Sequence, residues 1–357
     1  MRRGSRLALA LPLIAFGVAI AALLGAGSGS PSHSESQSSA SARPASSPGA
    51  ASQSDRPSAA SRARAAFAAA PHVRVAAAGA LPAPLEDTAI APLGAGRVAL
   101  LGGIDAAQSS VATVTLLDRG SARAGGTLPA PQHDAQAARL GADVYVFGGG
   151  VISSYDHILR YDPASGVVSA AGTLPSAASD VAVTTLGGTA YVVGGYDGAQ
   201  PLDTILAWRP GQAPRVVGRL PAGLRYAAVA AVGARLIIAG GTEGAGEAVS
   251  DAILMFDPAT GTVRQIGRLP VALTHASAAT VDGQVLVIGG RRSLAGAQSD
   301  AIFAIDPATG RVRNAGRLPT PLSDEAVASV GAKIIVAGGE SPAGVQSLLV
   351  TVTPTLS

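Results

Sequence analysis

The sequence predicts an all-β fold of six similar four-stranded units arranged around a common axis. Two short markers, each occurring six times, support this prediction. The first is a Gly-Gly pair that ends an apolar segment, at residues 102–103, 148–149, 194–195, 240–241, 289–290 and 338–339. The second is a Leu-Pro pair, at residues 81–82, 128–129, 174–175, 220–221, 269–270 and 318–319. Since both markers recur every 46 to 49 residues, we expect one repeat domain over residues 71–357 rather than several unrelated domains.

The residues within one repeat indicate four strands, named a to d from the axis outward. In residues 274–316, we expect strand a over 275–281, strand b over 284–288, strand c over 301–305 and strand d over 311–315. A tight hairpin is expected at 282–283 (DG), and a turn between c and d at 306–310 (DPATG). Segments such as RLIIA at 235–239 are apolar on both faces and must be covered on both sides. Radial stacking of the sheets covers them, which predicts a six-bladed β-propeller.

The repeat resembles that of the kelch family, through its Gly-Gly pair, its period and the Asp-Pro-x-Thr-Gly turn ahead of Leu-Pro. The resemblance spans about residues 71–357 and implies a six-bladed kelch β-propeller of the galactose oxidase and kelch-like superfamily, of extracytoplasmic bacterial type. The family has a tryptophan in strand d, where this chain has Val168, Val263 and Val312. The aromatic residue of strand c is present as Tyr161, Trp208 and Phe256, but is Ile305 in the fifth repeat. We expect these side chains to pack between neighbouring blades.

The last repeat lacks its outer strand. After the sixth Gly-Gly pair the sequence has room for one more strand, over 347–352, and then ends within a few residues. Residues 73–78 precede the first Leu-Pro pair by the same number of residues by which strand d of the fifth repeat precedes the last Leu-Pro pair. We therefore expect the N-terminal strand to close the last blade and to join the two ends of the ring.

The N-terminal 70 residues differ in composition from the rest. Residues 1–6 carry three arginines, and residues 7–26 are an uncharged apolar stretch long enough for a hydrophobic helix that crosses a membrane. We expect a signal anchor or a cleaved signal peptide over 1–27, with all later residues outside the cytoplasm. Residues 28–70, rich in Ser, Ala and Pro, are expected to form a disordered linker. The propeller is then membrane-anchored, or secreted if the N-terminal segment is cleaved.

Positive charge is concentrated in the same N-terminal part. Of 26 basic and 23 acidic residues, seven arginines and two acids lie in residues 1–70, so the rest carries a net charge of −2. A domain of this charge offers no broad surface for phosphates, and we expect no nucleic-acid partner. The absence of cysteine excludes disulfides, thiolate metal sites and a cysteine nucleophile. The sequence has no phosphate-cradling or dinucleotide motif, and we expect no cofactor.

Candidate site residues gather at the end of the sheets where the d–a and b–c connections meet. The b–c loops are long and charged and the a–b turns minimal, so we expect binding on the b–c face and little from the a–b face. Six residues after each Leu of the Leu-Pro marker stand Asp87, Asp134, Asp180, Tyr226, His275 and Asp324. We expect these residues to ring the mouth of a central channel. Further ligand-binding candidates beside them are Arg225, Glu243, Arg291 and Arg292.

Several roles stay open for these residues. Each Asp can bond backbone N–H groups of its own loop, or the four carboxylates can contact a polar ligand or a cation, although we expect no metal site. The chemistry of galactose oxidase needs a Tyr–Cys cross-link, which this chain cannot form. We expect a protein-interaction or ligand-binding module for a protein or cell-envelope ligand. The alternative is a carbohydrate-acting enzyme such as a sugar mutarotase, with Arg225 facing Asp87 or Glu243; the sequence predicts no catalytic residues beyond this analogy.

Overall fold

The computed structural model describes residues 72–245 and 248–355. The expected membrane segment at 1–27 and the expected linker at 28–70 lie outside these residues. Within the described ranges, the chain contains no helix with the length and apolarity needed to cross a membrane.

The described residues form six four-stranded antiparallel sheets, numbered 1 to 6, and each uses its strands in the order a-b-c-d. Sheet 1 contains β3 (Ala89–Gly94), β4 (Arg97–Leu101), β6 (Thr113–Asp118) and β7 (Ser121–Thr127). Sheet 2 contains β8 (His133–Leu140), β9 (Asp143–Gly150), β10 (His157–Tyr161) and β11 (Val168–Thr173). Sheet 3 contains β12 (Ala182–Leu186), β13 (Thr189–Val193), β14 (Thr204–Trp208) and β15 (Arg215–Arg219).

The remaining three sheets follow the same plan. Sheet 4 contains β17 (Ala228–Val232), β18 (Arg235–Ala239), β21 (Ala252–Asp257) and β22 (Thr262–Arg268). Sheet 5 contains β23 (Thr274–Val281), β24 (Gln284–Arg291), β25 (Ser299–Ile305) and β26 (Val312–Leu322). Sheet 6 contains β27 (Ala326–Val330), β28 (Lys333–Ala337), β31 (Leu348–Pro354) and, from the other end of the chain, β1 (Val73–Ala80).

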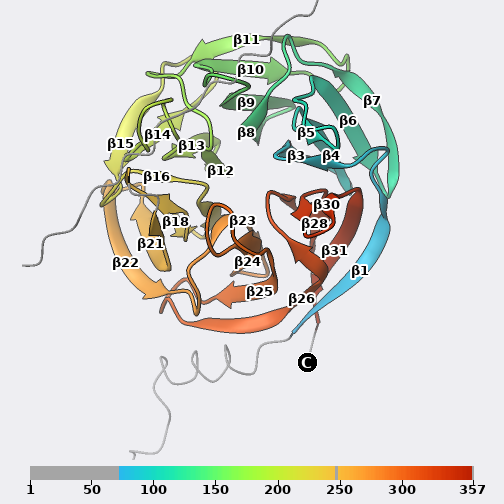
Figure 1. Cartoon of the computed structure of the whole chain (residues 1–357). Coiled ribbons are helices and arrows are strands. Elements are labelled where there is room, and N and C mark those ends of the chain that lie inside the picture. The colour runs from blue at the N-terminus through green and yellow to red at the C-terminus, as the bar shows by residue number, and fades with distance from the viewer. Residues whose placement is uncertain (1–71, 246–247, 356–357) are drawn as a thin grey trace, which may run out of the picture. The chain divides into compact units, whose positions relative to one another are not determined.

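The d–a and b–c connections contain three further small sheets of two or three short strands. They are β2 (Leu85–Glu86) with β5 (Ile104–Asp105), β16 (Leu224–Arg225) with β19 (Thr242–Glu243) and β20 (Ala248–Val249), and β29 (Glu340–Ser341) with β30 (Gly344–Val345). Figure 1 shows the six sheets standing around a common centre, with their a strands innermost.

Apolar side chains fill the space between each sheet and the next. Six separate hydrophobic clusters lie between sheets 1 and 2, 2 and 3, 3 and 4, 4 and 5, 5 and 6, and 6 and 1. The aromatic residues of strand c lie in them as expected: Tyr161, Trp208 and Phe256 are almost completely buried, and Ile305 takes the same place between sheets 4 and 5. Because both faces of each sheet are covered in this way, strands b are apolar on both faces after their first residue.

The N-terminal strand completes sheet 6. Strand β1 pairs antiparallel with β31, from Val73 opposite Pro354 to Ala80 opposite Leu348, with one irregularity between Ala77 and Gly79. Figure 1 shows β1, in blue, alongside the last strands of the chain, in red. The expected pairing of the two ends of the domain is therefore confirmed.

The first glycine of each Gly-Gly pair has a structural reason. Gly338 has a φ of +65°, and a Cβ there would clash with the carbonyl oxygen of Leu85 in the connection to the neighbouring sheet. We expect Gly338→Ala to destabilise the domain by roughly 3 kcal/mol, since it combines backbone strain with a clash that only a shift between sheets relieves. Gly331→Ala is the matched control, because Gly331 has nearly the same φ of +63° and a Cβ added there would have no neighbouring atom within 4 Å. Urea unfolding checks this, and equal losses in both variants would contradict the packing argument.

Candidate functional site

Six residues near the start of the a strands form a ring around the centre of the sheets, which we call the axial ring. Its members are Asp87, Asp134, Asp180, Tyr226, His275 and Asp324, all with a φ between 49° and 60°. Backbone hydrogen bonds of 3.0–3.2 Å join the ring members in series, each from the N–H of one member to the carbonyl of the member before it around the ring. The pairs, with the donor first, are Asp180 and Asp134, Tyr226 and Asp180, His275 and Tyr226, Asp324 and His275, and Asp87 and Asp324. The expectation that these six positions surround the axis is confirmed.

The left-handed backbone explains why aspartate recurs in the axial ring. Few residues other than glycine adopt a positive φ, and Asp and His are among those that do so most readily. The sequence left open whether each Asp bonds N–H groups of its own loop, and the structure places the carboxyl groups of neighbouring ring residues within reach of one another. The repeat of aspartate therefore has a structural cause in the backbone, and the chemistry comes from how the side chains are then brought together.

Four carboxyl groups follow one another around two thirds of the axial ring. They come from consecutive sheets, in the order Asp324, Asp87, Asp134 and Asp180. An arginine pairs with each end of this series: Nη2 of Arg291 lies 2.8 Å from Asp324, and Nη1 of Arg225 lies 3.3 Å from Asp180. The two arginines were expected beside the ring, and the structure places them where they neutralise its outer carboxylates.

The two middle carboxyl groups, Asp87 and Asp134, differ from the outer ones in their counter-charge. Among the described residues, the basic group nearest to either of them is Nε2 of His133, 3.5 Å from Asp134, and burial lowers the pKa of this histidine, which favours its neutral form. Burial, followed by the neighbouring carboxylates, raises the pKa of Asp87 and of Asp134 well above the usual range. A neutral carboxyl group can donate a hydrogen bond to its charged neighbour, which makes four close carboxyls compatible with a stable fold. The surroundings of Asp87 and Asp134 thus favour their protonated form.

The remaining third of the axial ring is aromatic and flanked by cations. The rings of Tyr226 and His275 stack, with centroids 3.6 Å apart, and the guanidinium of Arg225 lies 4.8 Å from the ring centroid of Tyr196 and 5.1 Å from that of Tyr226. Burial lowers the pKa of His275 to about 2, with Arg291 and Arg225 adding to the effect. His275 is therefore a neutral imidazole at any physiological pH.

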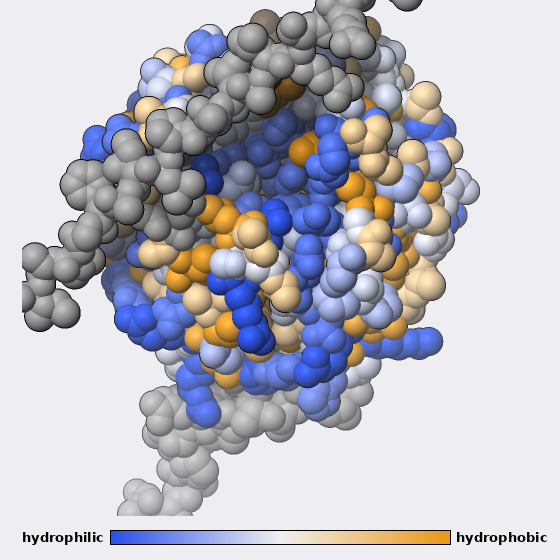
Figure 2. Space-filling view, viewed as in Figure 1, coloured by the Kyte–Doolittle hydropathy of each residue, from blue (hydrophilic) through white to orange (hydrophobic). Residues whose placement is uncertain are grey.

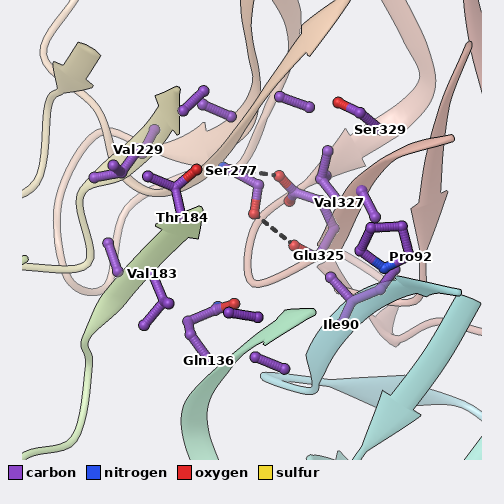
Figure 3. Close-up of a pocket in the computed structure, with 18 of the residues that line it drawn as sticks. Ile90, Pro92, Gln136, Val183, Thr184, Val229, Ser277, Glu325, Val327 and Ser329 are labelled. Atoms are coloured by element: carbon purple, nitrogen blue, oxygen red, sulfur yellow. Dashed lines mark hydrogen bonds between the residues drawn. The ribbon is translucent and has the colours of Figure 1, made fainter. Parts of the chain in front are cut away.

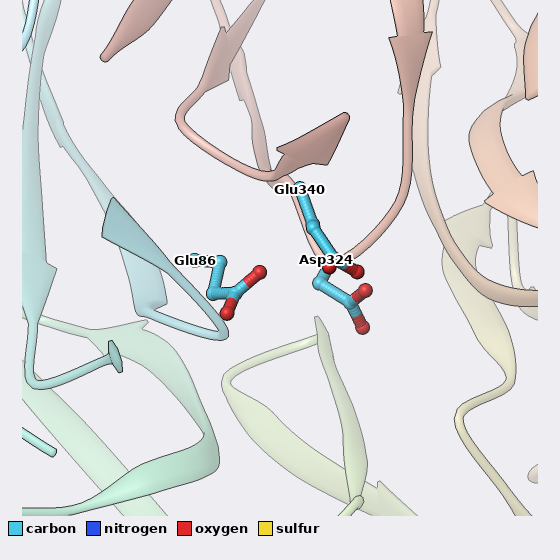
Figure 4. Close-up of side chains that lie close together, drawn as sticks. All are labelled: Glu86, Asp324 and Glu340. Carbon is cyan, nitrogen blue, oxygen red and sulfur yellow. The ribbon is translucent and has the colours of Figure 1, made fainter. Parts of the chain in front are cut away.

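A second acidic group lies beside the ring. Carboxylate oxygens of Glu86, Asp324 and Glu340 lie within 4.8 Å of one another (Figure 4). Nη1 of Arg291 is 3.2 Å from Glu340, so the arginine bridges two of the three acids, and Gln108 donates to Glu86 at 3.1 Å. Burial raises the pKa of Glu86 to about 7. Because Arg291 already supplies the positive charge, these acids are compatible with a cation only if the arginine moves.

The remaining predicted residues lie farther out on the b–c face. Glu243 belongs to β19, which pairs with β16 next to Arg225. Arg292 is exposed and takes part in none of the ring contacts described above. Figure 2 shows hydrophilic residues gathered around the hollow at the centre of this view.

A cavity of about 710 Å³ runs along the axis, and we call it the central channel. Its walls are the a strands of all six sheets, and its lining extends from the axial ring at one end to the a–b turns, such as 94–96 and Gly331, at the other. Among the described residues, the lining contains none of the b–c loops. The channel therefore reaches the a–b face, from which the sequence predicted little, and which of the two faces binds a ligand stays a prediction.

Sequence reasoning missed Glu325, an acid in the channel wall. This side chain is 3% exposed. Its Oε1 accepts the N–H of Ser277 at 3.3 Å, and its Oε2 is buried with no hydrogen-bond partner in the described part of the chain. Burial raises the pKa of Glu325 well above the usual range. An acid directly after Asp324, where the other repeats have Thr, Ala or Val, was the available signal in the sequence.

Comparison with known proteins agrees with this architecture. The sequence profile of the family described as "Kelch motif" matches residues 177–212 and 272–319, which contain most of sheet 3 and nearly all of sheet 5. The chain thus contains kelch motifs in these two stretches, and its fold is that of a β-propeller. The propeller is similar to a solved structure titled "Structure of YjhT", with a TM-score of 0.66 and 16% sequence identity over 78% of this chain and 99% of that one. No curated protein matches the sequence significantly. At this identity, the structural likeness concerns the fold.

Proposed function

We propose that the chain is a binding module, a closed six-bladed propeller whose b–c face holds a protein or cell-envelope ligand. The N-terminal segment 1–27 ties it to a membrane, with 28–70 as a spacer, or is cleaved to release it. Two features support this proposal: kelch repeats in general serve protein binding, and the b–c loops differ from sheet to sheet in length and charge while the strands repeat. A repeated scaffold with variable loops is a common design for recognition surfaces.

The observation that favours a protein partner most is an exposed apolar loop tip. In the b–c loop of sheet 2, Ile152 is 100% exposed and the preceding Val151 is 44% exposed. Tyr155, half-buried in the same loop, lies near His157 with ring centroids 5.0 Å apart. Two adjacent branched apolar residues at a loop tip favour burial against a partner surface.

The partner proposal is tested by capture from an envelope extract with the full chain. We expect Ile152→Asp to lose the captured partner, since it places a charge in the apolar contact. Val216→Asp is the matched control: Val216 is 49% exposed but lies on the outer strand β15 of sheet 3. The proposal fails if Ile152→Asp captures the same proteins as the wild type, or if both variants lose them equally.

The membrane proposal has its own test. We expect the full chain to sediment with membranes and its propeller to be digested by protease added outside intact cells. Replacing residues 7–26 with a polar sequence should abolish both properties. A propeller that stays protected in the cytosol of intact cells would contradict this location.

A second candidate function is an enzyme acting on a small carbohydrate. One observation favours it. Asp87 of the axial ring is an acid whose pKa is raised by burial, and Arg225 pairs with another member of the same ring, Asp180. Acids with a shifted pKa near an arginine are frequent in active sites. Replacing Arg225, Asp87 and Glu243 together separates the two functions. An enzyme would lose turnover of its sugar, whereas a binding module would keep partner capture through its loops.

A further inference from the structure

The end of the central channel at the axial ring is rich in carboxyl groups. Five acids line the channel: Asp87, Asp134, Asp180, Asp324 and Glu325. Arg225 and Arg291 pair with two of them, Asp180 and Asp324, and Asp134 lies beside the imidazole of His133. For Asp87 and Glu325, no ion pair with a basic residue is found within residues 72–245 and 248–355. The one arginine of the lining is Arg139, which is near the a–b turns and donates to the carbonyl of Gly141 at 3.1 Å.

Glu325 is an independent sign that the channel has a ligand. A buried carboxyl oxygen without a partner is costly, and native structures keep such groups mainly where they serve a purpose. Gly289 allows this carboxyl to be there, because a Cβ on Gly289 would lie 2.7 Å from Oε2 of Glu325. In the other five sheets the corresponding strand-a residue is Thr88, Ala135, Val181, Ala227 or Ala276. The fold therefore does not need an acid here.

The walls beyond the acids are mostly small and apolar. Ile90, Pro92, Val183, Val229 and Val327 line the channel together with many alanines (Figure 3). A volume of about 710 Å³ is within the range of small-molecule sites. A ligand that fits this lining has a positively charged end and an apolar body.

We propose that the central channel binds a small organic amine, with its ammonium group against Glu325 and the neighbouring ring acids and its alkyl body against the apolar walls. The ligand enters from the a–b face, which the lining of the channel reaches. This site is separate from the b–c face of the proposed function, so either proposal can fail without the other.

Binding of an amine has a specific signature in proton release. In the free channel, burial raises the pKa of Glu325, Asp87 and Asp134 and so favours their protonated forms. The titratable and charged groups that face them are Asp324, Asp180, Glu86, Arg291, Arg225 and His133. An ammonium group supplies the counter-charge that ionisation needs, so at least one carboxyl loses its proton when the amine binds. The affinity must then rise with pH.

The test is calorimetric titration of the full-length chain with hexylamine, compared with hexan-1-ol, which has the same alkyl body and no charge. We expect hexylamine to bind, and to bind more tightly at pH 8 than at pH 6. We also expect its binding to release protons, which makes the apparent binding enthalpy differ between two buffers of different ionisation enthalpy, neither of them a primary amine. Glu325→Gln should weaken hexylamine about tenfold, the scale of one charged hydrogen bond, with less proton release.

Two further variants keep the result interpretable. Gln136→Trp places a bulky residue in the channel wall on β8 of sheet 2, and it should abolish hexylamine binding while leaving every carboxyl in place. Asp118→Asn removes an exposed acid on β6, outside the channel lining, and should bind like the wild type. The proposal is overturned if hexan-1-ol binds as tightly as hexylamine, if Glu325→Gln and the wild type bind hexylamine equally, or if hexylamine does not bind.

Discussion

Deletion of residues 73–80, the whole of β1, should lower the melting temperature by about 10 °C or more. The deletion removes the seven residue pairs that β1 makes with β31, and each backbone hydrogen bond lost from them costs about 1 kcal/mol. It also removes Val73 and Val75, which pack against the core between sheets 5 and 6. A loss of several kcal/mol shifts the melting temperature by this amount in a domain of this size. The deletion further leaves β31 as an exposed edge, so we expect aggregation on heating.

The control for this deletion is the removal of eight residues from the expected linker, 45–52. That change shortens the chain equally and, if the linker prediction holds, leaves the melting temperature as in the wild type. Thermal unfolding followed by circular dichroism compares the two. A β1 deletion that melts like the wild type would mean that the pairing of the two ends contributes nothing to the ring.

Glu325→Gln should make the propeller more stable at pH 8 and reduce the dependence of its stability on pH. Burial raises the pKa of Glu325 in the folded state above its value in the unfolded chain. An acid of this kind contributes stability that is fully present below its unfolded pKa and is lost as the pH rises. Between the two pKa values, the free energy of unfolding falls by about 1.4 kcal/mol per pH unit for each such group. Gln keeps an oxygen for the N–H of Ser277 and has no proton to lose.

Urea unfolding at pH 5 and at pH 8 measures this effect. The wild type should be more stable at pH 5, and the gain from Glu325→Gln should appear mainly at pH 8. Some dependence on pH should persist in the variant, because the pKa values of Asp87 and Asp134 are raised as well. Asp118→Asn, at an exposed acid, should follow the wild type. Equal slopes in the wild type and in Glu325→Gln would show that Glu325 ionises as freely in the folded protein as in the unfolded chain.

Most of the strand order could be predicted from the sequence. Gly-Gly, Leu-Pro and Asp-Pro-x-Thr-Gly mark turns whose backbone geometry few other residues adopt, so their positions are fixed locally. Strand a of the fifth repeat, expected over 275–281, is Thr274–Val281, and the N-terminal strand expected over 73–78 is Val73–Ala80. The bounds of the outer strand of the fifth repeat were predicted less well. This strand was expected over 311–315, whereas it extends over Val312–Leu322, past the Leu-Pro pair of that repeat.

The chemistry of the centre could be predicted only in part. Position in the repeat was enough to place Asp87 and Asp324 near the axis, because every repeat contributes the same position. The hydrogen bonds between neighbouring ring residues, the pairing of Arg291 with Asp324 and the raised pKa of Asp87 depend on distances across sheets, which no local pattern contains. The central channel depends on the size of side chains that face one another from six different strands. Its extent could not be read from any one of them.

The most direct test of the closed ring is a disulfide between its two ends. Val75 and Val352 are directly opposite each other in β1 and β31, and the chain has no cysteine of its own. Neighbouring strands bring opposite residues within the distance that a disulfide spans. We predict that Val75→Cys with Val352→Cys forms an intramolecular disulfide, seen as faster migration on a non-reducing gel than on a reducing one. If the double variant forms only disulfide-linked dimers or keeps two free thiols, the ring is not closed by its N-terminal strand.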